Sequence, residues 1–312
     1  MSGFTPTQAA LPIWFGPPDI FVLDIPHIEG ETERAGPWLG ANAQPFSLVN
    51  IASASGGINA NPLTLRRSSR TGYLTSSLAR GPIGRFDKAN QFEATFENGT
   101  FASVSEENLL SGANYFCVET PLGWEVLQAG NAVLIAPKTY RFSHLLRGQG
   151  GSETEMVDLI GEGARCVALY TGLEVYDIAH DFIDLPIVLT AQIARREAEP
   201  FDFTYLARQL RPLSPVHVKF EIGAEGAILS WIRRTRLGGD NWTALEVPLS
   251  EGREFYRVQF FKNDAVLDTF ETDTPRLALS SAASAQLSAA DYVTIAQGSE
   301  LYGFGAQVRV DI

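Results

Sequence analysis

The chain has 312 residues, of which 45% are hydrophobic and 19% charged, and a formal net charge of −12. At about 150 residues per domain, this globular composition predicts two or three folded units. The surplus of carboxylates argues against nucleic-acid binding, which needs a concentrated basic face. No stretch approaches the roughly 18 consecutive apolar residues of a membrane span. Residues 1–10 lack the basic and apolar regions of a signal peptide, so we expect no Sec-type export.

The chain has two cysteines, Cys117 and Cys166. A disulfide between them is compatible with the sequence. Two thiols in a chain of this length are nevertheless more typical of buried small hydrophobic residues in a protein made in the cytoplasm. The sequence leaves both alternatives open and favours free thiols.

Short apolar runs bounded by turn residues, together with 11% aromatic residues, predict an all-β chain. Residues 20–25 form such a run, confined by prolines on both sides. Residues 53–62 are small residues and turn formers, which predicts a loop between paired strands at 43–52 and 63–67.

The clearest local pattern lies at residues 91–104, where Asn98-Gly99 supplies the two positive-φ residues of a type I′ turn. We therefore predict a β-hairpin there. The strand-like runs that follow are 115–119, 124–128, 132–136 after a turn at 129–131, 140–146, 166–176 and 183–193, the last interrupted by Pro186.

One short helix is predicted after the hairpin. Ser103 and Glu106 have the spacing of a capping box, and residues 105–111 before Gly112 fit one or two helical turns closed by glycine.

Residues 195–213 are charged and punctuated by proline, which predicts a linker with a domain boundary near Leu210. The expected division is a β-rich region over 1–194, a linker over 195–212 and a final domain over 213–312. About seven short strands in roughly 100 residues are typical of an immunoglobulin-like sandwich. The strands identified in this domain are 215–218, 227–231, 255–260, 276–279, 292–297 and 306–311.

The final domain opens with a proline, carries Leu-Ser-Trp231 on its second strand and Tyr256 on its third, and ends with Tyr292-x-x-x-x-Ala-x-Gly-Ser-Glu-x-x-Gly-x-Gly. In these features residues 212–312 resemble fibronectin type III domains. The resemblance implies that Trp231, Tyr256 and Tyr292 are buried anchors of the core.

Stretches along most of the chain carry a second resemblance. They are Val22-Leu-Asp-Ile-Pro26, Gly36-Pro37, Asn98-Gly-Thr100, Gly123-Trp-Glu-Val-Leu-Gln128, Tyr140-Arg-Phe-Ser-His-Leu-Leu-Arg-Gly-Gln-Gly150 and Leu210-Arg-Pro-Leu-Ser-Pro-Val-His217. In order and spacing they resemble the C-terminal part of the large baseplate protein, sometimes called megatron, at the tail tip of gene transfer agents and related siphophages.

That resemblance implies a structural, non-catalytic protein of a tail tip or baseplate, made in the host bacterial cytoplasm and located in the virion. The implied partners are the hub, the distal tail protein and a host surface receptor, in a homotrimer because such hubs are three-fold. The family's protein is far longer and carries a hydrolase-like region ahead of the resembling part. We therefore expect any wall-degrading activity to lie outside this chain, as in a split gene or a separately encoded tip protein.

The cluster Asp177-x-x-His180-Asp181-x-x-Asp184 gathers hard metal ligands, or a base beside carboxylates. On a helix the three aspartates would share one face. The flanking pattern is strand and loop, so the sequence favours a solvated acidic turn over a metal site.

Three further motifs lack residues that their chemistry would require. Ser143-His144 lacks a Gly-x-Ser-x-Gly elbow, which favours a buried hydrogen-bonded pair over a nucleophile. Residues 161–166 place a cysteine where a dinucleotide fingerprint needs its third glycine, and residues 148–151 lack the Lys-Ser/Thr of a phosphate loop. We therefore predict no catalytic, cofactor-binding or metal residues, and no enzyme.

One zone is rich in basic residues: Arg66, Arg67, Arg70, Arg80, Arg85 and Lys88. It suggests an electrostatic contact with an acidic subunit or with lipopolysaccharide phosphates, although a solvated loop is the favoured alternative. Asn98-Gly-Thr and Asn241-Trp-Thr match glycosylation acceptors, but turn chemistry explains the first and bacterial synthesis would void both.

The competing function is a carbohydrate-binding or glycosidase accessory protein, because fibronectin-like modules also accompany such enzymes. Trp14, Trp38 and Trp242 would form a sugar-stacking platform if they are exposed. Buried tryptophans would favour the structural role.

Overall fold

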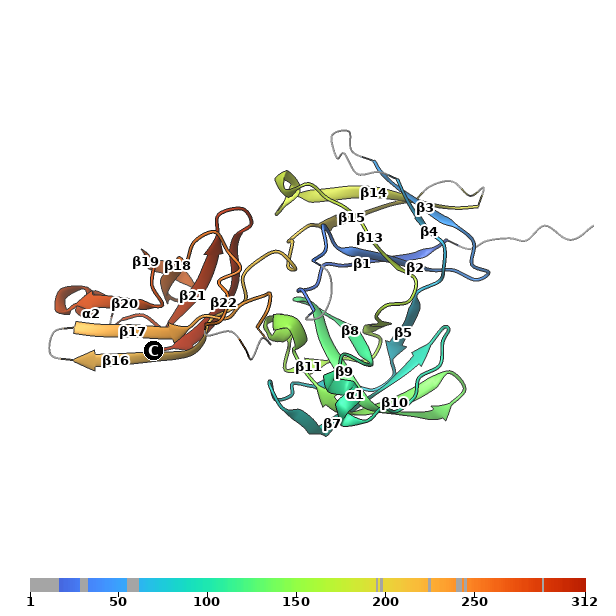
Figure 1. Cartoon of the computed structure of the whole chain (residues 1–312), viewed down its shortest axis with the longest axis horizontal. Coiled ribbons are helices and arrows are strands. Elements are labelled where there is room, and N and C mark those ends of the chain that lie inside the picture. The colour runs from blue at the N-terminus through green and yellow to red at the C-terminus, as the bar shows by residue number, and fades with distance from the viewer. Residues whose placement is uncertain are drawn as a thin grey trace, which may run out of the picture.

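The structure is a computed structural model that describes residues 17–28, 33–54, 62–194, 196, 199–223, 226–239, 243, 246–287 and 289–312. It is 51% strand and 8% helix, which confirms the predicted all-β class. Figure 1 shows two packed lobes, which we call the body, and a C-terminal sandwich standing to one side. No helix in the described ranges is long and apolar enough to cross a membrane.

The first lobe of the body is a β-sandwich built from two separate parts of the chain. One sheet has the order β1(Asp19–Leu23), β2(Trp38–Asn42), β13(Leu173–Val175), and the other β15(Glu199–Thr204), β14(Pro186–Ile193), β3(Val49–Ser53), β4(Leu63–Leu65). Along β14 the apolar residues alternate inward, so Ile187, Leu189 and Ile193 are fully buried. The predicted pairing across the 53–62 loop is confirmed, because β3 pairs with β4.

The segment predicted as a linker, 195–212, differs from that expectation. Strand β15 pairs along β14, and Tyr205, Ala207 and Leu210 are buried in the core of the first sandwich. The sequence suggested a linker because β15 is an exposed edge strand, which tolerates charged residues and Pro200. The free connection to the final domain is therefore confined to the residues around Pro212.

The second lobe is a closed six-stranded barrel inserted between β4 and β13. Its strand order is β10(Thr139–Leu146), β7(Phe86–Phe96), β5(Arg70–Leu74), β12(Arg165–Ala168), β8(Tyr115–Thr120), β9(Gly123–Ala136). Alternate residues of β7 point inward, and Phe92 stacks on Phe142 with ring centroids 4.9 Å apart. The smaller elements around it are β6(Leu78–Ala79), β11(Leu159–Ile160), α1(Glu106–Leu110) and the 3₁₀ helices η1(Gln149–Glu155) and η2(His180–Phe182).

The predicted hairpin over 91–104 is wrong. Strand β7 pairs with β5 and β10, and residues 100–104 form no strand. Gly99 has a positive φ but Asn98 does not, and the Asn98 amide donates to Ser68 Oγ at 2.8 Å. Phe101 packs against Phe96 at 4.3 Å between ring centroids, so burial of this ring overrides the local turn pattern.

Two further predictions in the barrel need correction. The turn expected at 129–131 is absent, because β9 continues through it and exchanges its partner β8 for β10 near Gln128. The predicted helix exists as α1, but its N-cap is Ser105, whose hydroxyl accepts from the Asn108 amide. Ser103 instead bonds to the backbone of Ala132.

An apolar cluster joins the barrel to the first sandwich. Phe21 and Trp38 pack against Trp124 and Val167, and the Trp124 indole donates to the Val22 carbonyl at 2.9 Å. The two thiols form no disulfide and lie on opposite faces of the barrel wall: Cys117 belongs to this cluster and Cys166 to the barrel interior. Neighbouring positions on opposite faces of a sheet cannot be bridged without backbone movement.

The C-terminal sandwich packs a three-stranded sheet on a four-stranded one. The sheets are β16(Val216–Gly223), β17(Gly226–Ile232), β20(Arg276–Ser280) and β19(Ala265–Thr272), β18(Tyr256–Lys262), β21(Tyr292–Ser299), β22(Gly303–Asp311). Trp231, Tyr256 and Tyr292 are buried as predicted, with Trp231 edge-on to Tyr256 at 5.1 Å. The sequence missed β19, which is an almost wholly exposed edge strand, and α2(Ser281–Leu287).

Candidate functional site: an arginine-lined junction

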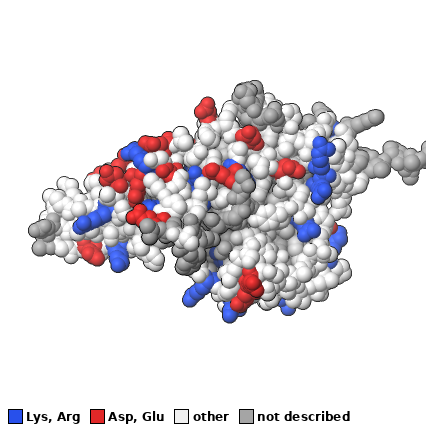
Figure 2. All heavy atoms as spheres, viewed as in Figure 1, with Lys and Arg blue, Asp and Glu red and all other residues white. Residues whose placement is uncertain are grey.

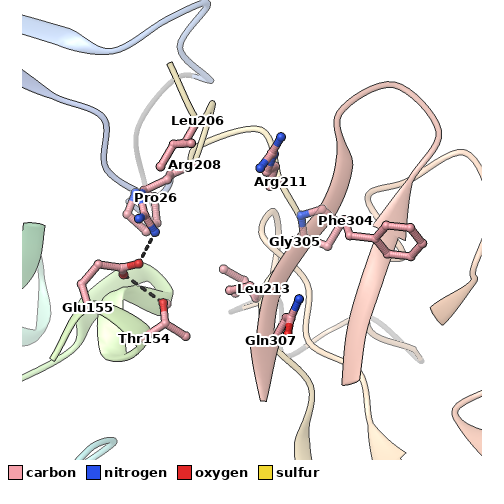
Figure 3. A pocket seen from close by; sticks show the side chains of 13 residues that line it. Pro26, Thr154, Glu155, Leu206, Arg208, Arg211, Leu213, Phe304, Gly305 and Gln307 are labelled. Carbon is pink, nitrogen blue, oxygen red and sulfur yellow. Dashed lines mark hydrogen bonds and ion pairs between the residues drawn. The ribbon is translucent and has the colours of Figure 1, made fainter. Parts of the chain in front are cut away.

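The body and the C-terminal sandwich meet around a small cavity of about 270 Å³. Figure 3 shows its walls: Glu155 and Thr154 come from η1, Arg208 and Leu213 from the connecting segment, and Phe304 from β22. A second, more polar cavity of about 430 Å³ shares Leu213 with the first. The Leu213 side chain therefore lies between two cavities.

A close backbone contact guides the chain into the sandwich. The Ala306 amide donates to the Pro212 carbonyl at 3.2 Å, which ties the start of β22 to the connecting segment. A Cβ on Gly305 would lie 1.9 Å from the Pro212 oxygen. Only glycine permits this approach, so Gly305 is required for the close contact between β22 and the connecting segment.

Glu155 is a buried acid at the junction. Its side chain is 3% exposed and forms an ion pair with Arg208, and Thr154 donates to it at 2.9 Å. Burial raises the pKa of Glu155 to about 7, with the Arg208 charge acting in the opposite direction. This carboxyl can therefore change its charge close to neutral pH.

Arginines of the C-terminal sandwich reach across to the body. Arg234 forms an ion pair with Glu153 of η1 and donates from Nε to the Ser214 carbonyl at 2.7 Å. Arg236 forms an ion pair with Glu33 of the first sandwich, while its Nε lies 3.1 Å from Glu251 of its own sandwich.

Arg211 provides a further link from the connecting segment. It contacts Asp184 of the body at 2.5 Å and donates to the Tyr302 carbonyl of the C-terminal sandwich at 3.0 Å. The Tyr302 ring lies edge-on to His180 with centroids 4.9 Å apart. The junction is therefore held mainly by polar and charged groups.

The predicted acidic cluster supplies two of these contacts. Asp177, His180, Asp181 and Asp184 are all exposed, around η2. Within the described residues no group of three or more His, Cys, Asp and Glu side chains could hold a metal ion. His180 and Asp184 instead contact the C-terminal sandwich and the connecting segment.

The other sequence motifs also have structural partners. The predicted buried pair of Ser143 and His144 differs from the structure, where both are only partly buried and have separate partners. Ser143 accepts a hydrogen bond from Asn131 at 3.2 Å, while His144 stacks on Phe86 and lies 2.8 Å from Glu106.

The glycine-rich 148–151 stretch begins η1 with positive φ angles. A Cβ on Gly151 would lie 2.5 Å from Leu213. These glycines let η1 approach the connection. By contrast, Gly161 and Gly163 lie in an open turn.

Glu125 and Arg147 form a buried pair that the sequence did not reveal. Arg147 donates to both Glu125 oxygens at 2.5 and 2.8 Å and to the Ala79 carbonyl at 2.8 Å, with Asp87 3.5 Å away. All three charged side chains are at most 1% exposed. Two stretches of the baseplate resemblance, 123–128 and 140–150, thus meet in one ion pair that joins β9 to the end of β10.

The basic zone does not form one surface. Gly72 of β5 pairs with Phe96 at one end of β7, whereas Arg85 precedes the other end of this 11-residue strand. At about 3.3 Å per residue, the groups around Arg70 and Arg85 lie on opposite ends of the barrel. Figure 2 likewise shows Lys and Arg side chains in separate groups, with acidic groups between them.

The tryptophan platform is not assembled from the described residues. Trp38 is 9% exposed and is covered by the Arg34 guanidinium, 4.1 Å from the ring centroid. Trp14, Trp242 and the Asn241 acceptor lie outside the described residues. Burial of Trp38 favours the structural role over sugar stacking.

A family model described as "Rcc01698-like, C-terminal" matches residues 69–167. This span runs from the residue before β5 to β12, so it covers the inserted barrel. Among solved structures, the chain is similar to the central fibronectin-III array of RIM-binding protein, with 9% identity, a TM-score of 0.22 and coverage of 93% of this chain and 98% of that one. No curated protein matches the chain.

Proposed function

We propose that this protein is a structural component of a phage-type tail tip or baseplate, without catalytic activity, whose barrel attaches to the hub. The observation that carries the proposal is the coincidence of the matched family span with the whole closed barrel. A gene-transfer-agent family name on this lobe agrees with the baseplate resemblance of the sequence.

The residues of the resemblance support the same proposal. Two stretches supply the buried Glu125–Arg147 pair, and a third, residues 210–217, forms the connection to the C-terminal sandwich. The pair holds two strands of the barrel together, and the connecting segment sets where the C-terminal sandwich is attached. Such a role suits a protein whose task is to hold partners at defined positions.

The proposed partners are the hub and the distal tail protein, with the chain repeated three-fold in the virion after synthesis in the host cytoplasm. The C-terminal sandwich would then face outward, where a host receptor is within reach. Contacts within such an assembly depend on neighbouring rings, so the isolated chain can be monomeric.

Antibody labelling of intact particles tests the location. An antibody raised against the C-terminal sandwich should decorate the tail tip in electron micrographs, with pre-absorbed antibody as the control. Label on the capsid or along the tail tube would contradict the proposal.

The non-enzymatic part has a separate test. Incubation of the chain with cell wall and with polysaccharides should release no sugars. Release that a single carboxylate substitution abolishes would establish a glycosidase. Retention on a polysaccharide gel without release would instead favour the accessory carbohydrate-binding function.

A further inference from the structure

We propose that the C-terminal sandwich is a releasable module, which pivots in the connecting segment ahead of Pro212 between a docked position held by arginine–carboxylate pairs and an undocked position. This inference goes beyond the tail-tip proposal and does not depend on it, because it concerns the isolated chain.

The C-terminal sandwich has a hydrophobic core of its own. The buried cluster of the C-terminal sandwich contains no residue of the body. Apolar side chains at the junction include Leu213, which lines both cavities, and Tyr302, which packs against the first-sandwich core. Domains joined by a small polar interface move relative to one another by default.

Two ion pairs attach the C-terminal sandwich to the body. Arg234–Glu153 and Arg236–Glu33 join segments 81 and 203 residues apart. One member of each pair is partly exposed, Arg234 at 25% and Glu33 at 43%, whereas Glu153 and Arg236 are 13% and 7% exposed. Solvent ions therefore reach each pair from one side. Exposed ion pairs are screened at a Debye length of about 3 Å in 1 M salt. High salt should therefore release the module.

Glu155 lines the junction cavity opposite β22 of the docked module (Figure 3). The charged groups around it are Arg208 and Arg211 of the connecting segment and Glu153 of its own helix, whereas β22 contributes Phe304 and Gln307. Undocking opens the shared cavity and returns this carboxyl to water.

The sign of the pH effect follows from Glu155. The docked state keeps the Glu155 proton with a pKa of about 7, against an ordinary value of 4.5. Between these values the docked state binds more protons, so acid favours docking and alkali favours release. Full exposure on release would change the docked-to-undocked ratio by about 30-fold between pH 5.5 and pH 8.

The test is a distance measurement between spin labels on the full chain. Leu134→Cys on the barrel and Val266→Cys on β19 are exposed positions, and both native cysteines are fully buried. At low salt and pH 5.5 the label pair should give one narrow distance. At 1 M salt, or at pH 8, a broad second population should appear.

Variants distinguish the contribution of the ion pairs from that of Glu155. The double change Arg234→Gln and Arg236→Gln should raise the second population at low salt, while Arg253→Gln, which breaks a pair within the sandwich, should not. Glu155→Gln should remove the dependence on pH and keep the docked distance at pH 8. A melting curve of each variant confirms folding.

One narrow distance in every variant, salt and pH would overturn the proposal. A pH dependence that survives Glu155→Gln would overturn the assigned role of Glu155. An equal response to Arg253→Gln would show that the cross-junction pairs are not what holds the module.

Discussion

The barrel and the C-terminal sandwich are attached to the first sandwich in different ways. The barrel junction buries aromatic and aliphatic side chains, among them Phe21, Trp38 and Trp124. The other junction joins its partners through arginines and surrounds Leu213 with cavities. Apolar burial responds little to salt or pH, whereas partly exposed ion pairs respond to both.

This difference indicates a division of tasks. The two chain crossings and the apolar cluster fix the barrel on the first sandwich, so these lobes form one body. The single connection and the charged contacts leave the C-terminal sandwich adjustable. A tail-tip protein would need both properties: a fixed base on the hub and an outer part that can change its orientation.

The largest expected effect tests the independence of the C-terminal sandwich. Residues 213–312 should fold alone, and Trp231→Ala should destabilise them by about 3–5 kcal/mol, since deletion of a buried aromatic leaves a cavity. Urea denaturation followed by circular dichroism measures this in the fragment and in the full chain. Val266→Ala, on an exposed position, is the matched control. A fragment that fails to fold would contradict separate cores.

The apolar junction should be nearly as sensitive. Trp124→Ala should lower the stability of the body by about 3 kcal/mol, because it removes a buried ring and its bond to the Val22 carbonyl. Calorimetry should show the body transition at lower temperature and the C-terminal transition unmoved. Equal shifts of both transitions would mean that the chain unfolds as one unit.

The stability of the body should depend on pH through Glu155. Its pKa is raised from 4.5 to about 7, so the native state holds a proton that the unfolded state releases between these values. Stability should therefore fall as the pH rises from about 4.5 to 7, by about 2 kcal/mol. Glu155→Gln should flatten this dependence, whereas Glu93→Gln, in an exposed pair, should preserve it. A stability that rises through this window in the parent but not in Glu155→Gln would contradict the burial of the carboxyl.

The smallest effect is expected at the polar junction. Arg234→Gln should cost about 1 kcal/mol or less, as for other partly exposed ion pairs. X-ray scattering should nevertheless show a larger radius of gyration at low salt. A loss of several kcal/mol would mean that this junction is as fixed as the apolar one.

Local alternation predicted much of the fold. The strands of the C-terminal sandwich and its three aromatic anchors follow from period-2 patterns in 227–231, 255–260 and 292–297. The predicted hairpin at Asn98-Gly99 is wrong because the packing of Phe101 against Phe96 outweighs the local turn pattern. The insertion of the barrel into the first sandwich was hidden, because no local feature reveals that β4 and β13 share one core.

The junction could not be predicted for a similar reason. The partners of Arg234 and Arg236 are far away in sequence, and single charges on loops carry no periodic pattern. The glycines at 148–151 were the available signal. They suggest a phosphate loop but lack its Lys-Ser/Thr, and Gly151 instead makes room for Leu213.

A cryo-electron microscopy reconstruction of particles that contain this protein tests the central claim most directly. The account predicts density for the barrel and first sandwich against the hub at the tail tip, in three-fold arrangement. It also predicts weaker density for the C-terminal sandwich at high salt. A chain located in the capsid or tail tube, or with its barrel remote from the hub, would contradict the account.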